Sequence, residues 1–198
     1  MTLNNVGQAG RIRIESILVI FGGLPGSGKT TIARLLAEKI DAVYLRIDTI
    51  EQSLRTSGPV ADYLRDAGYV AAYAMAGDNL RLGHIVVADS VNPLEITRQA
   101  WFSVAQCASV PAIEIEVICS DVSEHERRVE TRETDVAGFK LPSWQDVVNQ
   151  KYEAWNRPHL VVDSTRESAS EIVTSIISHS SLIPEQGLAK TGVPPIKG

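Results

Sequence analysis

The stretch that most restricts how this chain can fold is a glycine-rich loop, GLPGSGKT, at residues 23–30. It matches the pattern G-x-x-x-x-G-K-[ST] and stands between the apolar segment ILVIF (17–21) and the helix-forming segment KTTIARLLAEKI. Glycines at these positions let successive backbone N–H groups converge on a phosphate, and the positive end of the next helix adds to the attraction. The loop therefore predicts a strand–loop–helix unit that binds a polyphosphate.

The residues in and around this loop predict ATP with Mg²⁺ as the ligand. Lys29 is expected to reach the β- and γ-phosphates, and the hydroxyl of Thr30 to bind Mg²⁺. The loop after the last predicted strand is expected to lie beside the adenine, although Asp163 or Ser164 is equally plausible there as a simple helix cap. The predicted nucleotide-contacting residues are Gly23, Leu24, Pro25, Gly26, Ser27, Gly28, Lys29, Thr30, Thr31, Ser164 and Thr165.

Short apolar runs alternate with helix-like segments along the rest of the chain. Strands are predicted at 17–21, 42–47, 85–88, 112–120 and 159–164. The helices expected between them include 92–108, with Asn92 as its cap and Pro93 in its first turn, and 143–155. This alternation is typical of βαβ units, so we expect one doubly wound α/β domain over residues 11–181. Loose tails are expected at 1–10 and 182–198.

Composition argues against several classes of function. The formal net charge is −5 and there is no long basic run, which disfavours broad binding to nucleic acid. No stretch of 18 consecutive apolar residues is present, so no membrane span is expected. Cys107 and Cys119 lack the spacing of metal ligands and are expected to be reduced thiols of a cytoplasmic protein. The sequence indicates no oligomeric state.

Other motifs narrow the class of protein that uses the phosphate loop. A regulatory GTPase needs an N-K-x-D motif, which is absent, and the D-x-x-G match at Asp135–Gly138 lies in a predicted loop far from the third strand. Motor and transporter ATPases usually end the third strand in an acidic pair, whereas VVADSVN carries one carboxylate, Asp89. This pattern favours a small phosphotransferase.

Four charged residues are candidate participants in the chemistry. Asp89 ends the third strand, where open α/β sheets bind ligands, and could hold Mg²⁺ directly or through water unless it only caps a turn. Asp48 ends the second strand and could accept a proton from an acceptor hydroxyl, but with Glu51 it also resembles a capping box. Arg128 and Arg132 are spaced to share a helical face, which could close over the phosphates or be merely solvated.

Four stretches together resemble the small P-loop kinases: GGLPGSGKTTIARLLAEKI, YLRIDTIEQSL, IVVADSVNPLEITRQAW and CSDVSEHERRVETR. That group includes adenylylsulfate kinase, gluconate kinase, chloramphenicol phosphotransferase, polynucleotide kinase and zeta-toxin-like kinases. The resemblance covers nearly the whole chain outside the tails. It implies a three-layer α/β fold with a parallel sheet in the order 2-3-1-4-5. It also implies ATP and Mg²⁺, Asp48 as the acceptor-side aspartate, and a mobile lid that carries Arg128 and Arg132.

One position departs from part of this group. Polynucleotide kinases carry an arginine three residues after the acceptor-side aspartate, where this chain has Glu51. With the acidic net charge, this argues against a nucleic-acid end as acceptor and favours a neutral hydroxyl compound. The sequence therefore predicts an ATP-dependent phosphotransferase that acts on a hydroxyl of a small molecule. The alternatives are a nucleotide-dependent switch or slow ATPase with a protein partner, and a nucleoside monophosphate kinase.

Overall fold

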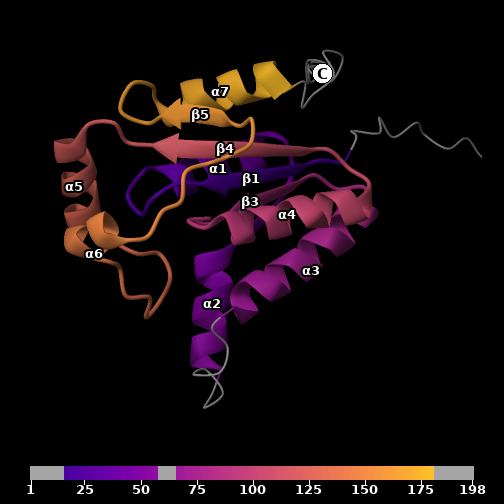
Figure 1. The fold of residues 1–198 in the computed structure, drawn as a ribbon, viewed down its shortest axis with the longest axis horizontal. Coiled ribbons are helices and arrows are strands. Elements are labelled where there is room, and N and C mark those ends of the chain that lie inside the picture. The colour runs from indigo at the N-terminus through magenta and orange to yellow at the C-terminus, as the bar shows by residue number, and fades with distance from the viewer. Residues whose placement is uncertain (1–15, 58–65, 181–198) are drawn as a thin grey trace, which may run out of the picture.

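The computed structural model describes residues 16–57 and 66–180, and its strands form one parallel sheet of five strands (Figure 1). The strand order is β2-β3-β1-β4-β5, and every pairing between neighbours is parallel. The predicted α/β class and the order 2-3-1-4-5 are thus confirmed. The strands are β1 (Leu18–Gly22), β2 (Val43–Arg46), β3 (Val86–Asp89), β4 (Ala112–Ile118) and β5 (Leu160–Asp163).

Helices cover both faces of the sheet. α1 (Lys29–Lys39) and α7 (Ala169–Ser180) pack on one face, and α3 (Ala67–Arg81) and α4 (Glu95–Ala108) on the other. In β1, Val19 and Phe21 belong to the core under α1 and α7, while Leu18 and Ile20 belong to the core under α3 and α4. Since both faces are covered, the central strand is apolar at every one of these positions.

Three further helices follow the carboxyl ends of the strands, and the last two of them in chain order lie beyond the arrowheads in Figure 1. α2 (Ile47–Thr56) follows β2 directly, α5 (Val122–Thr131) follows β4, and α6 (Trp144–Asn149) comes after a loop. α5 begins with a local cap, because the side chain of Asp121 accepts a hydrogen bond from the backbone N–H of Glu124. The candidate site is built at this end of the sheet.

α4 begins later than the sequence predicted. Asn92 is not its cap and Pro93 is not in its first turn, because the helix starts at Glu95. Asn92 is fully buried in a left-handed conformation, and its side-chain amide donates to the carbonyl of Phe21 at 2.7 Å. The first backbone N–H of the helix is instead bound by the carboxylate of Glu153, 58 residues away. A local capping pattern cannot reveal such a partner.

α6 is shorter than predicted. The helix expected over 143–155 ends at Asn149, and residues 151–158 form no regular element. This segment passes between β4 and α4: the Tyr152 hydroxyl donates to Glu116 at 2.9 Å, and the Trp155 indole lies against Gly22. An irregular path can place these side chains on the sheet, whereas a continued helix would turn part of them away.

Some predictions fall on residues that are not described. The tails predicted at 1–10 and 182–198 lie outside the described residues. Cys107 and Cys119 are free thiols. Within 16–57 and 66–180, no helix has both the length and the apolar character needed to cross a membrane.

Candidate active site

The glycine loop between β1 and α1 has a backbone that few other residues can adopt. Gly23, Gly26 and Gly28 have φ values of 139°, 85° and 93°, in the region that favours glycine. A Cβ atom on Gly23 would meet the carbonyl oxygen of Val117, and one on Gly26 would meet the Val129 side chain. The glycines therefore let the loop curve and also let β4 and α5 approach it closely.

Lys29 is the first residue of α1 and lies at the end of this loop. Its side chain belongs to the buried set, with 7% of the residue exposed. Burial lowers the pKa of the Lys29 ammonium, while the charges of Asp89 and Asp48 raise it. The lysine is thus a desolvated cation at the end of the glycine loop, with two carboxylates around it.

Asp89, at the end of β3, is almost fully buried behind the loop. Its Oδ2 accepts a hydrogen bond from the Tyr44 hydroxyl at 2.7 Å. Its Oδ1 is buried and has no hydrogen-bond partner among the described residues. α4 starts only at Glu95, so Asp89 does not cap that helix. One carboxylate oxygen is therefore available for a cation or a water molecule.

Asp48 lies in the first turn of α2 and does not cap it. The helix begins at Ile47 with Arg46 in the N-cap position, so the capping-box interpretation is wrong. The Asp48 side chain is 32% exposed and lies 3.9 Å from the Arg46 guanidinium. Glu51, the other half of the supposed box, forms an ion pair with Arg55 at 3.1 Å instead. The Asp48 carboxylate is therefore partly exposed and does not serve as a helix cap.

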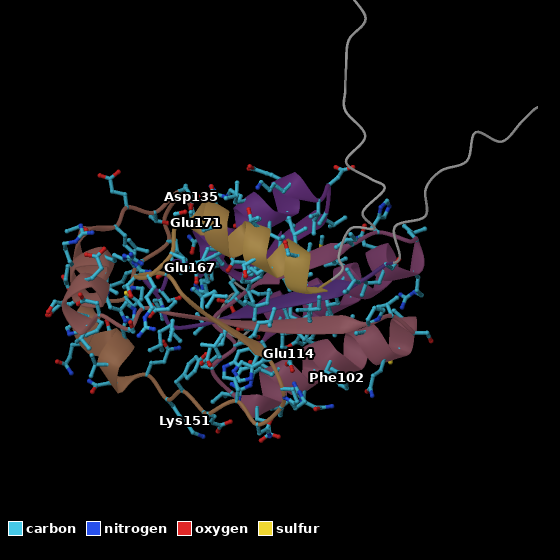
Figure 2. All side chains as sticks on the ribbon, turned by 90° about the horizontal axis from the view of Figure 1, so that it is seen from above. Phe102, Glu114, Asp135, Lys151, Glu167 and Glu171 are labelled. Atoms are coloured by element: carbon cyan, nitrogen blue, oxygen red, sulfur yellow. The ribbon has the colours of Figure 1, made fainter. Side chains whose placement is uncertain are left out.

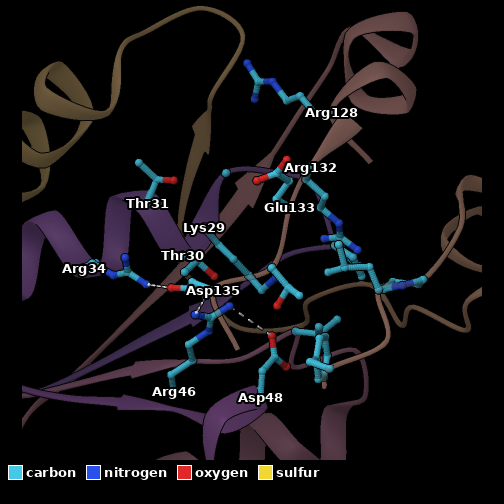
Figure 3. Close-up of a pocket in the computed structure, with 18 of the residues that line it drawn as sticks. Lys29, Thr30, Thr31, Arg34, Arg46, Asp48, Arg128, Arg132, Glu133 and Asp135 are labelled. Carbon is cyan, nitrogen blue, oxygen red and sulfur yellow. Dashed lines mark hydrogen bonds and ion pairs between the residues drawn. The ribbon is translucent and has the colours of Figure 1, made fainter. Parts of the chain in front are cut away.

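The two predicted arginines of α5 have different surroundings. Arg128 donates to Glu124 and to the Ser164 hydroxyl, both at 2.7 Å. Arg132 follows the end of the helix, and its Nε and Nη2 are buried with no hydrogen-bond partner in the described chain. Burial lowers the pKa of Arg132, and the Asp48 carboxylate opposes this shift. In Figure 3 the two side chains diverge, and Arg132 lies nearer Lys29.

A cavity of about 1110 Å³ opens beside the loop and joins many of these residues (Figure 3). The members of the predicted set that line it are Pro25, Gly26, Gly28, Lys29, Thr30, Thr31, Asp48, Arg128 and Arg132. Outside its lining lie Gly23, Leu24, Ser27, Asp89, Ser164 and Thr165. Ser164 packs on Gly28, and its hydroxyl accepts a hydrogen bond from Arg128. The Thr165 hydroxyl instead donates to Asp163 at 2.7 Å.

Three of the charged residues that line the cavity without having been predicted for the site form one cluster. Arg34 of α1 and Arg46 of β2 both donate to the carboxylate of Asp135, each at 2.6 Å. Hydrogen bonds from Arg46 and Arg34 lower the pKa of Asp135 to about 2. Sequence reasoning did not assign Asp135 to the site, because its D-x-x-G motif lies in a predicted loop. Its partners Arg34 and Arg46 are 101 and 89 residues away along the chain.

His125 is a further residue that the sequence did not single out. It is buried on α5, with Nε2 2.8 Å from the Pro25 carbonyl oxygen and its ring against Trp144. Val129, one turn later, is buried beside it and contacts the loop at Gly26. Their spacing of four is the only sequence signal for this face. α5 is therefore fastened to the glycine loop itself.

The sheet order, the loop after β1 and the buried lysine at the start of α1 define a P-loop NTPase fold of the small-kinase type. A family model described as an AAA domain, AAA_33, matches residues 18–148. The chain therefore belongs to this family of P-loop kinase domains.

Several known proteins are similar over most of this chain. A probable thymidylate kinase of Methanocaldococcus jannaschii is 25% identical over 86% of this chain and 99% of its own. APS kinase CysC of Mycobacterium tuberculosis, solved with AMPPNP and APS, has a TM-score of 0.65 at 20% identity, covering 84% of this chain and 98% of that one. A gluconokinase of Sinorhizobium meliloti has a TM-score of 0.55 at 20% identity, covering 86% and 94%. These two structural likenesses concern the fold.

Proposed function

We propose that this protein is an ATP-dependent phosphotransferase that moves the γ-phosphate of ATP to a hydroxyl group of a small molecule. The observation that carries the proposal is that Lys29, Asp48 and Arg132 line one cavity beside the glycine loop. A phosphate cradle, a carboxylate and a guanidinium whose Nε and Nη2 have no hydrogen-bond partner among the described residues are the parts that phosphoryl transfer needs.

Each of these residues has a separate part in the proposed reaction. The loop N–H groups and Lys29 hold the β- and γ-phosphates, and Arg132 stabilises the charge that spreads over the transferred group. The acceptor oxygen forms its bond to the γ-phosphorus as the bond from phosphorus to the ADP oxygen breaks. Asp48 takes the acceptor hydroxyl proton, and ADP leaves.

The residues present also fit Mg²⁺. Asp89 offers a buried carboxylate oxygen without a partner in the described chain, and Thr30 offers a hydroxyl at the end of the loop. No group of three or more His, Cys, Asp and Glu residues among those described could hold a metal ion by itself. This suits an ion bound by one carboxylate together with substrate phosphates. Thr30 and Asp89 would hold the ion, which when bound neutralises charge on the β- and γ-phosphates.

A nucleoside monophosphate kinase is the second candidate, because the probable thymidylate kinase of Methanocaldococcus jannaschii matches nearly its whole length. Its acceptor oxygen would belong to a phosphate and would need no base. This chain has Glu51, paired with Arg55, where polynucleotide kinases carry an arginine. Arg34 and Arg46, which line the cavity together with Asp48, supply positive charge there instead.

The test is an acceptor screen with Mg²⁺-ATP that reads ADP release. Its panel contains sugars, sugar acids, amino alcohols and the nucleoside monophosphates. A hydroxyl compound that raises turnover at least tenfold, and fails to do so with Asp48→Asn, supports the first candidate. Stimulation by a nucleoside monophosphate, retained in Asp48→Asn, supports the second. Turnover that no small acceptor changes, but a protein partner does, would instead indicate a switch.

A further inference from the structure

Asp135 connects the loop after α5 to α1 and to the end of β2. It lies on residues 132–142, the loop between α5 and α6, which we call the lid loop. Its partners Arg34 and Arg46 stand on α1 and at the end of β2, the edge strand farthest from β5. The cavity lies between these parts, and residues of both line it. Figure 3 shows Arg34, Asp135 and Arg46 joined in a row below Lys29.

A second contact seats the same loop, independently of the charges. Gly138 has a φ of 74°, and a Cβ atom placed on it would lie 3.0 Å from the side-chain amide nitrogen of Gln52. Gln52 is a buried residue of α2, so the loop rests on this helix at close range. A turn from Val136 to Phe139, with a hydrogen bond of 3.1 Å, shapes the segment that is seated.

Apolar packing alone does not hold the loop in this position. A second cavity, of about 410 Å³, remains between α2, β2 and the loop, and Val136 and Ala137 line it. Gaps of this size forfeit the dispersion contacts that a packed interface would supply. The charged contacts across this cavity are the two hydrogen bonds that Asp135 accepts from Arg34 and Arg46, each at 2.6 Å.

We infer that Asp135 is a clasp that holds the lid loop closed over the nucleotide pocket by bridging Arg34 and Arg46, and that it thereby keeps Arg132 in place. The inference rests on the proposed nucleotide binding at the glycine loop. Asp135 is a positioning residue here: it bridges two arginines of the opposite wall and acts on the reaction through the loop that carries Arg132.

The exposure of the three side chains makes the clasp reversible. The Arg34 and Asp135 side chains are 48% and 53% exposed, while that of Arg46 is only 13% exposed. Water and salt compete for exposed ion pairs, which are individually weak. The buried Arg46 side chain thus keeps its position, and the Asp135 carboxylate can separate from it when a nucleotide enters or ADP departs.

The first measurement is the dissociation rate of a fluorescent N-methylanthraniloyl ATP with Mg²⁺, followed by stopped flow. Asp135→Asn keeps the shape of the side chain and removes its charge, and we expect dissociation about tenfold faster, equal to ~1.4 kcal/mol. Arg46→Ala should accelerate it similarly, and the double variant should be no faster than either single one. The matched control is Asp78→Asn, whose carboxylate forms an exposed 2.6 Å pair with Arg81 on α3.

Gly138→Ala tests the contact between the lid loop and Gln52 without changing a charge. The added methyl group requires a strained backbone and pushes against Gln52, so it should lift the loop and speed dissociation as Asp135→Asn does. Gly83→Ala is its control, since Gly83 also has a positive φ of 93°, but Ser16 alone of the described residues lies near its Cβ position. It should leave dissociation unchanged.

Hydrogen exchange of residues 132–142 in the nucleotide-free protein provides the second readout. Faster exchange there in Asp135→Asn than in wild type supports the clasp, whereas equal exchange and equal dissociation overturn it. Slower dissociation in Asp135→Asn, or tighter binding of inorganic phosphate, also overturns it and assigns the two arginines to an anion of the acceptor. Wild-type protein that binds no nucleotide refutes the proposed function, and lid exchange still decides whether Asp135 fastens the loop.

Discussion

At the scale of single residues, the environment of Lys29 explains its expected part in binding. Lys29 as a residue is 7% exposed, so its ammonium has lost hydration, and burial lowers its pKa. The nearby carboxylates of Asp89 and Asp48 oppose this lowering of the pKa without cancelling it, and neither is an ion-pair partner of Lys29 in the described chain. A polyphosphate in the loop would supply negative charge at hydrogen-bonding distance, so the lysine should favour the bound state.

Lys29→Ala should weaken the binding of AMPPNP with Mg²⁺ by about 1.5–3 kcal/mol, the worth of a hydrogen bond to a charged group. The fold should remain intact, since the substitution removes a buried charge and leaves the loop glycines in place. Isothermal titration calorimetry measures the affinity, with Lys39→Ala at the exposed end of α1 as the control. Equal affinities for Lys29→Ala and wild type would contradict the assignment.

Asp48 offers a test that separates chemistry from stability. Because it does not cap α2, both Asp48→Asn and Asp48→Ala should lower stability only slightly, by about 0.3–1 kcal/mol for the lost charge in the first turn. Both should lower acceptor-dependent transfer roughly 10²–10⁴-fold, the usual effect of losing a general base. Thermal unfolding and ADP release are measured on both variants. Glu51→Gln on the same helix is the control, and undiminished transfer in Asp48→Asn would end the assignment.

At the scale of elements, α5 links the glycine loop to the lid loop. His125 and Val129 fix one face of the helix to the loop at Pro25 and Gly26. The same helix carries Arg128 to Ser164 and ends where Arg132 turns into the cavity. A movement of α5 would therefore change the phosphate cradle and the lid arginine together.

Arg132→Ala should reduce kcat about 10²-fold and raise the KM for ATP much less, because its guanidinium, whose Nε and Nη2 have no partner in the described part of the chain, acts on charge that develops during transfer. Arg128→Ala should also lower kcat, but by less, since Arg128 is already bonded to Glu124 and Ser164. Steady-state kinetics with the identified acceptor measures both. Arg81→Ala on α3 is the control. Wild-type kcat values in both variants would show that α5 presents only a solvated face.

At the scale of the whole molecule, the segment 151–158 braces the face of the sheet beside α4. Arg98, which is 1% exposed, donates to the carbonyls of Asn92 and Ala154 and stacks over Trp155 at 4.9 Å. Farther along, Arg157 pairs with Glu114 of β4 at 2.6 Å and stacks on Phe102 of α4, two residues that lie near each other in Figure 2. The brace thus joins α4, β4 and the start of the glycine loop.

Arg98→Met should lower the free energy of unfolding by about 3 kcal/mol, because the buried carbonyl of Asn92 and the part-buried contact at Ala154 lose a charged donor and the ring of Trp155 loses its cation. Urea denaturation measures the change. Arg81→Met, an exposed arginine on the neighbouring helix, should alter stability by less than about 0.5 kcal/mol. A loss of stability no larger in Arg98→Met than in this control would contradict the role of the brace.

Much of this architecture is encoded locally and was predictable. The loop at 23–30 requires glycine at positions with positive φ and lysine at the start of α1, and a spaced motif records both requirements. The strands that are buried on both faces show continuous apolar runs, which fixed the α/β class, and likeness to known kinases supplied the strand order. The lengths of α4 and α6 were not predictable, because Glu153 and Trp155 find their partners far away along the chain.

The sequence by itself therefore determined the phosphate loop, the parallel α/β fold and the presence of Asp48 and Asp89 at the carboxyl ends of strands. Tertiary structure decided which charges meet. Asp135 became part of the cavity only when folding brought its loop to Arg34 and Arg46, and Arg132 reached the cavity only because α5 ends at Thr131. Ion pairs between distant segments follow no local periodicity, since their geometry depends on the path of the whole chain between them.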